Sequence, residues 1–198
     1  MKNEDIIKNF ANTSYPANAV LDKKNSANTL RLKKDYGAEL LKLFSYNLLI
    51  GYKAKDTVHV AYMPHTPLSH TSRVHVNMLT RCTEDNENAI LVPLSVRDTN
   101  IPDTTTMVNR YEAGMEHLLK SYGLAVPVVA EQFQRLYRSY KKYCELYEVT
   151  PKNMDKYKIA YNNSKSTEYM ASLSTTREDY YNHRQALIRE GHALADSI

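Results

Sequence analysis

The stretch that most constrains the fold lies between residues 43 and 82. Two runs of aliphatic, aromatic and β-branched residues, 43–52 and 57–63, flank a short polar segment at residues 53–56. In the second run Val58, Val60 and Tyr62 alternate with their neighbours, which is the period of two expected for a half-buried strand. The pattern predicts a β-hairpin.

A helix should follow this hairpin. Pro64 and Pro67 end the second strand, because proline cannot donate a hydrogen bond to a strand ladder. The hydroxyl-rich residues 69–72 then offer side-chain oxygens that can cap a helix N-terminus. A third strand is predicted over residues 89–96, after an acidic loop.

The C-terminal half has a helical pattern. We predict helices over residues 107–122, from Pro127 to about Tyr147, from about residue 151, and from about residue 177 to 195, with a polar loop over residues 162–174. The fold class is therefore α+β, with a small antiparallel sheet (residues 43–97) and a helical C-terminal half.

We expect three regions along the chain. Residues 1–42 form an N-terminal helix and linker, residues 43–100 a hairpin, helix and strand unit, and residues 101–198 a helical region. Neither of the last two has much core by itself, so they should pack as one compact domain.

Composition excludes several function classes. The five glycines form neither a Walker A loop nor a GxGxxG fingerprint, and there is no HExxH or CxxC motif. The formal net charge of +4 is only mildly basic, and no apolar run is long enough to span a bilayer. With two separated cysteines and no secretory signal, a reduced, cytoplasmic chain is expected.

Residues 44–79 resemble a small bacteriophage-encoded domain of unknown function. The matching residues are Ser45-Tyr46, Ile50, Val58, Val60, Ser69, Thr71-Ser72-Arg73 and His75. In the turn, His65, Pro67 and His70 depart from the aromatic–Ser–Thr run that this family shows. The resemblance implies a phage origin and a hairpin-plus-helix unit, and it implies no reaction.

Four of the seven histidines, His59, His65, His70 and His75, suggest a metal site or a histidine-dependent enzyme as one alternative. Zinc needs three or four converging ligands. On a helix, His70 and His75 would point about 140° apart, which argues against convergence. Histidines that cap, hydrogen-bond or face solvent are the simpler interpretation, and we expect no metal and no cofactor.

Two features could bind phosphate or an acidic partner. The first is the turn at residues 71–75, where hydroxyls at a helix N-terminus lie beside Arg73 and His75. The second is the helix over residues 127–147, which places its tyrosines on one face and its cations on the opposite face. The cations are Arg135, Arg138, Lys141 and Lys142. The ordinary alternatives are a helix cap and a solvated charged face.

The leading functional hypothesis is a phage-encoded accessory protein without catalytic activity. It would bind a host or phage macromolecule in the cytoplasm of the infected bacterium, for example to inhibit a host defence system. A nucleic-acid-binding protein that contacts phosphate through the basic helix face is the main alternative. No membrane partner is expected, and the tyrosine-rich helix would also suit a homo-oligomer.

Overall fold

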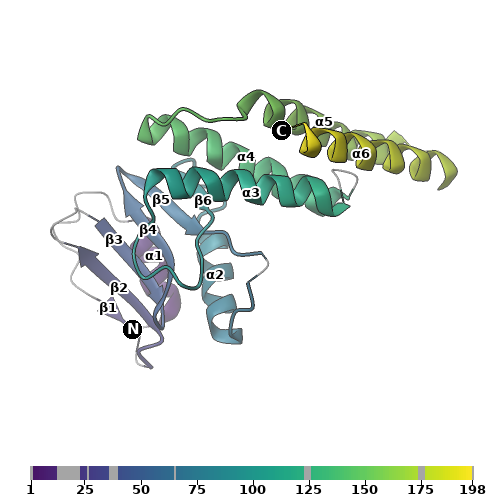
Figure 1. The fold of residues 1–198 in the computed structure, drawn as a ribbon. Coiled ribbons are helices and arrows are strands. Elements are labelled where there is room, and N and C mark those ends of the chain that lie inside the picture. The colour runs from purple at the N-terminus through teal and green to yellow at the C-terminus, as the bar shows by residue number, and fades with distance from the viewer. Residues whose placement is uncertain are drawn as a thin grey trace. The chain divides into compact units, whose positions relative to one another are not determined.

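The computed structural model describes residues 2–12, 23–25, 27–35, 40–64, 66–122, 126–173 and 177–197. The chain divides into two compact units, Met1–Asp103 and Thr104–Ile198 (Figure 1). This division lies close to the predicted boundary between residues 100 and 101. The α+β class with a helical C-terminal half is confirmed. That the two units pack as one domain stays a prediction.

The first unit contains a six-stranded sheet in the order β1-β2-β3-β4-β5-β6. Neighbouring strands are antiparallel except β5 and β6, which are parallel. Helix α2 connects that parallel pair, as a crossover connection requires. The strands are β1 (Lys23–Lys24), β2 (Leu30–Asp35), β3 (Leu40–Ser45), β4 (Leu48–Ala54), β5 (Thr57–Ala61) and β6 (Ala89–Val92).

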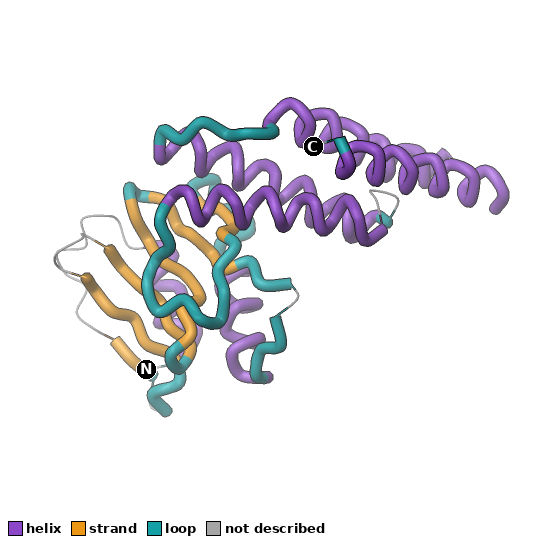
Figure 2. The backbone as a smooth tube through the Cα atoms, in the orientation of Figure 1, coloured by secondary structure: helices purple, strands orange, loops and turns teal. Residues whose placement is uncertain are grey.

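Two helices, α1 (Asn3–Asn12) and α2 (His70–Cys82), cover one face of this sheet. Figure 2 shows α1 behind the strands. Helix α1 packs on β2, and α2 packs on β3, β4 and β5. The core between helices and sheet is aliphatic, apart from Phe10. Its buried members are Ile6, Ile7, Phe10, Leu30, Leu32, Leu41, Leu43, Ile50, Val58, Val60 and Leu79.

The predicted hairpin is formed by β4 and β5. Its two-residue turn, Lys55-Asp56, has φ angles of 48° and 57°. Positive φ at both central residues is what a type I′ turn needs to match the twist of the flanking strands. The run 43–52, predicted as one strand, instead divides at Tyr46-Asn47 into β3 and β4.

The sheet starts earlier than predicted, and this corrects the range 43–97. Strands β1 and β2 and half of β3 come from residues assigned to the N-terminal helix and linker. Leu30 and Leu32 alternate with cations, a period-two signal hidden by the surrounding Asn, Ser and Lys residues. The parallel β5–β6 pair also means that the sheet is not wholly antiparallel.

The second unit contains four helices within the described residues: α3 (Thr104–Tyr122), α4 (Pro127–Tyr147), α5 (Met154–Leu173) and α6 (Arg177–Asp196). The loop predicted over residues 162–174 is wrong, because α5 continues through it to Leu173. Its polar residues favour a loop locally, but α5 packs against α4 and α6, and such packing outweighs weak propensity.

Tyrosines dominate the core of this helical unit. Tyr111, Tyr140, Tyr143 and Tyr157 are fully buried and lie in ring contact. The Tyr140 hydroxyl donates to Glu112 Oε1 at 2.8 Å. The tyrosine face of α4 therefore packs inward, as the helical spacing predicted.

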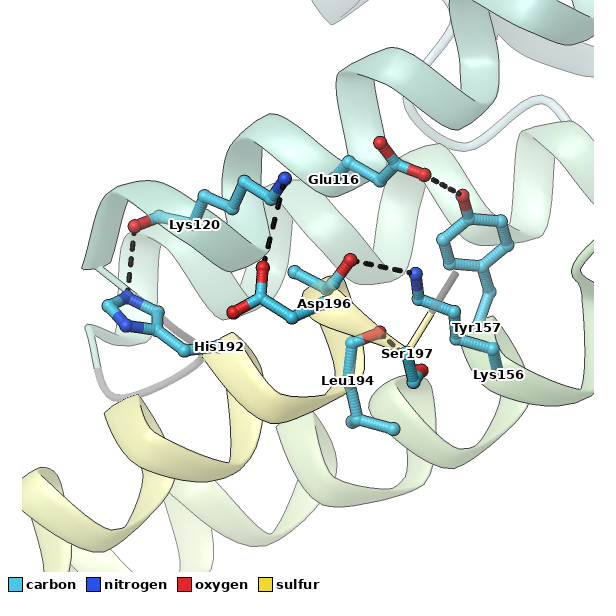
Figure 3. Close-up of polar contacts among 9 residues, drawn as sticks. Glu116, Lys120, Lys156, Tyr157, His192, Leu194, Asp196 and Ser197 are labelled. Atoms are coloured by element: carbon cyan, nitrogen blue, oxygen red, sulfur yellow. Dashed lines mark hydrogen bonds and ion pairs between the residues drawn. The ribbon is translucent and has the colours of Figure 1, made fainter.

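Hydrogen bonds and an ion pair connect the C-terminal end of α6 to α3 and α5 (Figure 3). His192 donates to the backbone carbonyl of Lys120 at 3.0 Å, and Lys120 Nζ lies 4.0 Å from Asp196 Oδ1. Lys156 donates to the Ala195 carbonyl at 3.4 Å. A cation near the last carbonyls of a helix also interacts favourably with its dipole. None of the described helices is both long enough and apolar enough to cross a membrane.

Gly51 allows the two helices to approach the sheet, and its replacement tests this packing. A Cβ at Gly51 would lie 2.9 Å from the His59 carbonyl oxygen and 2.9 Å from Leu79 Cδ2. Because the first of these is backbone, Gly51→Ala should destabilise the first unit by about 1–3 kcal/mol. Gly114→Ala is the control, since a Cβ there meets only the flexible Leu136 side chain, at 3.2 Å. Urea unfolding followed by circular dichroism would contradict this account if the two variants lost equal stability.

Candidate functional site

Three residues that carry the phage-type resemblance meet beneath α2. Ser45, at the end of β3, donates to Ser72 Oγ at 3.0 Å and lies 2.9 Å from His75 Nδ1. Ser69 caps α2 by accepting from the Ser72 backbone N–H, and its hydroxyl donates to Ser72 Oγ at 3.1 Å. The predicted hydroxyl cap is thus confirmed at Ser69, and the cap is part of a larger network.

This network extends to two asparagines that sequence reasoning missed. Asn3, in α1, places its Nδ2 atom 2.9 Å from His75 Nε2. Asn25, which follows β1, donates from Nδ2 to Asn3 Oδ1 at 2.8 Å. The network therefore joins α1, the β1–β2 connection, β3 and α2. Asn25 could have been suspected from its place before a strand in an Asn- and Ser-rich run, where Asn commonly bonds the nearby backbone.

The direction of the hydrogen bond between Asn3 and His75 follows from Asn25. Its Oδ1 accepts the backbone N–H groups of Thr29 and Leu30 at 2.7 and 3.2 Å. Its amide nitrogen must therefore face Asn3 Oδ1, which leaves the Asn3 amide nitrogen to face His75 Nε2. A side-chain amide nitrogen can only donate, so His75 Nε2 accepts.

His75 must then carry its proton on Nδ1, and it donates this proton to Ser45 Oγ. A nucleophilic serine needs the opposite arrangement, in which histidine accepts the hydroxyl proton. Ser45 and His75 are also only 0% and 1% exposed. The arrangement holds elements together, and its deduced proton position is the opposite of the one that a serine nucleophile needs from its general base.

Electrostatics favour the neutral form of His75. Burial lowers the pKa of His75 below its usual value. Protonation would also put an N–H on Nε2, opposite the Asn3 amide donor. Rotation of the Asn3 amide would remove this clash of donors at His75, but it would turn the Asn3 amide nitrogen toward the Asn25 amide nitrogen, which is also a donor. Asn25 cannot rotate in turn, because its oxygen accepts two backbone N–H groups. Burial and the direction of the hydrogen bonds therefore both favour the neutral form of His75.

His59 and His70 do not join His75. His59 lies on the opposite face of the sheet, stacked on Tyr52 with ring centroids 4.1 Å apart. Burial lowers the pKa of His59 to about 3, although hydrogen bonds to the backbone of Thr57 and Tyr52 oppose this shift. His70 begins α2 and is exposed, and His65 is outside the described residues. Across the described part of the chain, no group of three His, Cys, Asp or Glu side chains could hold a metal ion.

The proposed phosphate-binding turn is split by the fold. Arg73 is exposed, whereas the hydroxyl of Ser72 and the ring of His75 point into the buried network. Arg73 therefore does not share a surface with the Ser72 hydroxyl and the His75 ring, which were expected to act beside it.

The four cations of α4 lie on the side of the helix opposite its tyrosine core, as predicted. Arg138 and Lys141 are exposed, and Arg135 and Lys142 are half-buried. Two acids lie among them at this helical spacing, Glu131 and Glu145, and Lys141 Nζ is 3.8 Å from Glu145 Oε1. This face is therefore mixed in charge.

A more strongly basic surface lies on β1–β3, on the face opposite α1 and α2. Lys24, Arg31, Lys33 and Lys42 occupy it. Their alternation with the buried Leu30, Leu32, Leu41 and Leu43 was the signal that could have revealed them.

The network direction leads to a testable change in the pKa of His75. In Asn25→Asp the carboxylate still accepts from Thr29 and Leu30 but cannot donate to Asn3. The Asn3 amide should then rotate and present Oδ1 to His75 Nε2, so the pKa of His75 should rise. Titration of the ring protons by NMR would measure this, with His59 as the internal control. An unchanged pKa of His75 would contradict the deduced direction.

The two buried histidines also predict acid sensitivity. An unfolded histidine titrates near pH 6.5, whereas the pKa of folded His75 is lowered and that of His59 is about 3. Between these limits the unfolded chain binds protons that the folded chain does not. The free energy of unfolding should therefore fall, as pH drops below about 6.5, by up to about 1.4 kcal/mol per pH unit for each histidine.

Urea unfolding at several pH values checks this effect. His75→Gln keeps an acceptor for Asn3 but cannot titrate, so its pH dependence should be shallower by one proton. Equal pH dependence in wild type and His75→Gln would show that His75 is not held neutral.

Comparison with known proteins adds no family to this description. We found no match for the chain among protein-family models, curated proteins or solved structures. The phage-type resemblance stays a prediction that rests on its own residues, of which the structure brings Ser45, Ser69, Ser72 and His75 together.

Proposed function

We propose that this chain is a non-catalytic binding protein of the phage accessory type, which acts on a host or phage macromolecule in the infected cell. The observation that carries the proposal is the chain of contacts from Asn25 through Asn3 to His75, from which we infer that His75 donates to Ser45. The residues of the resemblance form a structural network, so their chemistry is used to hold the first unit together. Inhibition of a host defence system is the role that a small phage accessory protein suggests.

A binding role also agrees with how the first unit is built. Its hydrogen-bonded network joins α1, β3 and α2 on one face of the sheet and leaves the other face of β1–β3 for contacts with a partner. A rigid platform loses little conformational entropy on binding, and this favours affinity.

Nucleic-acid binding through α4 is the second candidate. It is supported by the outward orientation of Arg135, Arg138, Lys141 and Lys142. Glu131 and Glu145 on the same side reduce the attraction for phosphate, and the tyrosines on the opposite side cannot stack on bases.

Two measurements on the purified protein test these proposals. A fluorophosphonate probe, which labels activated serines, should leave Ser45 unmodified in the folded protein, and labelling at Ser45 would overturn the non-catalytic proposal.

The 260/280 absorbance ratio before and after a high-salt wash reports nucleic acid that co-purifies. If α4 holds that nucleic acid, Arg138→Gln/Lys141→Gln should reduce the salt dependence of binding by about one unit for each lost cation.

A further inference from the structure

Four cations lie together on the face of β1–β3 that α1 and α2 do not cover. In the strand register Lys24 is opposite Arg31, and Lys33 is opposite Lys42. Residues opposite one another on neighbouring strands have Cβ atoms roughly 5 Å apart, and alternate residues along a strand are about 6.6 Å apart. The cations therefore form a compact array.

This array is costly for the free protein. Like charges directly opposite in a sheet destabilise it, and here both facing pairs are positive. Among the described residues of these three strands the only acid is Asp35, which lies 2.9 Å from Lys42 Nζ. Lys24 and Lys33 are exposed to solvent. An anionic ligand would relieve the repulsion between the pairs.

An aromatic side chain lies beside these cations, in contrast to α4. Phe44 is directly opposite Arg31 on β3 and is half-buried. Arg31 Nη2 donates to the backbone carbonyl of Tyr46 and to Asn47 Oδ1, which fixes the guanidinium next to the β3–β4 turn. The Tyr46 side chain in that turn is 46% exposed.

We propose that this face of β1–β3 binds single-stranded nucleic acid, with Lys24, Arg31 and Lys33 on the phosphates and Phe44 and Tyr46 on the bases. The inference rests on the proposed binding function and names its partner. Single strands fit better than duplexes, because only unpaired bases can stack on aromatic side chains. Lysines near a sheet edge also deter strand pairing, but that role needs neither Arg31 nor Phe44 beside them.

Fluorescence anisotropy with a labelled single-stranded oligonucleotide tests this inference on the full chain. Lys24→Gln/Lys33→Gln changes two exposed residues and should weaken binding about tenfold at about 50 mM salt. Its salt slope should fall by about 1.4, since each phosphate contact on a single strand contributes about 0.7. Arg81→Gln/Arg97→Gln removes the same charge from exposed positions of the same unit, and it should bind within about twofold of wild type.

Phe44→Leu tests the aromatic contribution. It keeps the charges and should weaken binding about fivefold or more, with circular dichroism to confirm the fold. A duplex of the same sequence should bind more weakly than the single strand. The affinity for a poly-glutamate peptide should be unchanged by Phe44→Leu.

Three results would overturn the inference: no binding of the single strand at low salt, equal binding by wild type and Lys24→Gln/Lys33→Gln, or tighter binding of poly-glutamate than of the oligonucleotide. The last of these would assign the face to an acidic protein and leave the binding function intact. Cleavage of the oligonucleotide, followed on a gel in the same samples, would instead contradict the non-catalytic function.

Discussion

The first unit depends on a single side-chain amide whose orientation is fixed by backbone. Asn25 accepts two main-chain N–H groups, so its remaining donors can point only toward Asn3 and Thr29. The orientation of Asn25 determines the orientation of Asn3, which in turn determines the tautomer of His75 and makes Ser45 Oγ the acceptor of the His75 proton. Four parts of the chain that are distant in sequence are thereby held in one relative position.

The aliphatic core and this network make different contributions. Burial of side chains such as Leu41 and Val60 stabilises any arrangement that removes them from water, because the hydrophobic effect is not directional. The network accepts far fewer arrangements, since each buried donor or acceptor left without a partner costs about 1–3 kcal/mol. We infer that the network selects how α1 and α2 sit on the sheet.

The two faces of the sheet have different roles in this account. The face toward α1 and α2 is filled by apolar side chains and the Ser45–His75 network. On the other face, the row Lys33, Lys42, Tyr52 and His59 changes from exposed cation to buried ring across the sheet. On this face the charged region is therefore confined to β1–β3, because the side chains at Tyr52 and His59 are buried rings.

Local signals in the sequence predicted the local features. The β4–β5 hairpin, the cap at Ser69 and the start of α4 at Pro127 each depend on residues close in the chain. The features that failed depend on distant partners. Strand β2 is defined by its pairing with β3, and α5 persists through polar residues because other helices support it. The contact between Asn3 and His75 joins residues 72 positions apart, so no spacing rule could indicate it.

The most direct test of the account is the protonation state of the His75 ring in the wild-type protein. Long-range ¹H–¹⁵N correlation spectra near neutral pH distinguish a ring protonated on Nδ1 from one protonated on Nε2. We predict a neutral ring with its proton on Nδ1, donated to Ser45. A proton on Nε2 would mean that His75 can accept from Ser45, and it would return the pair to the candidates for catalysis.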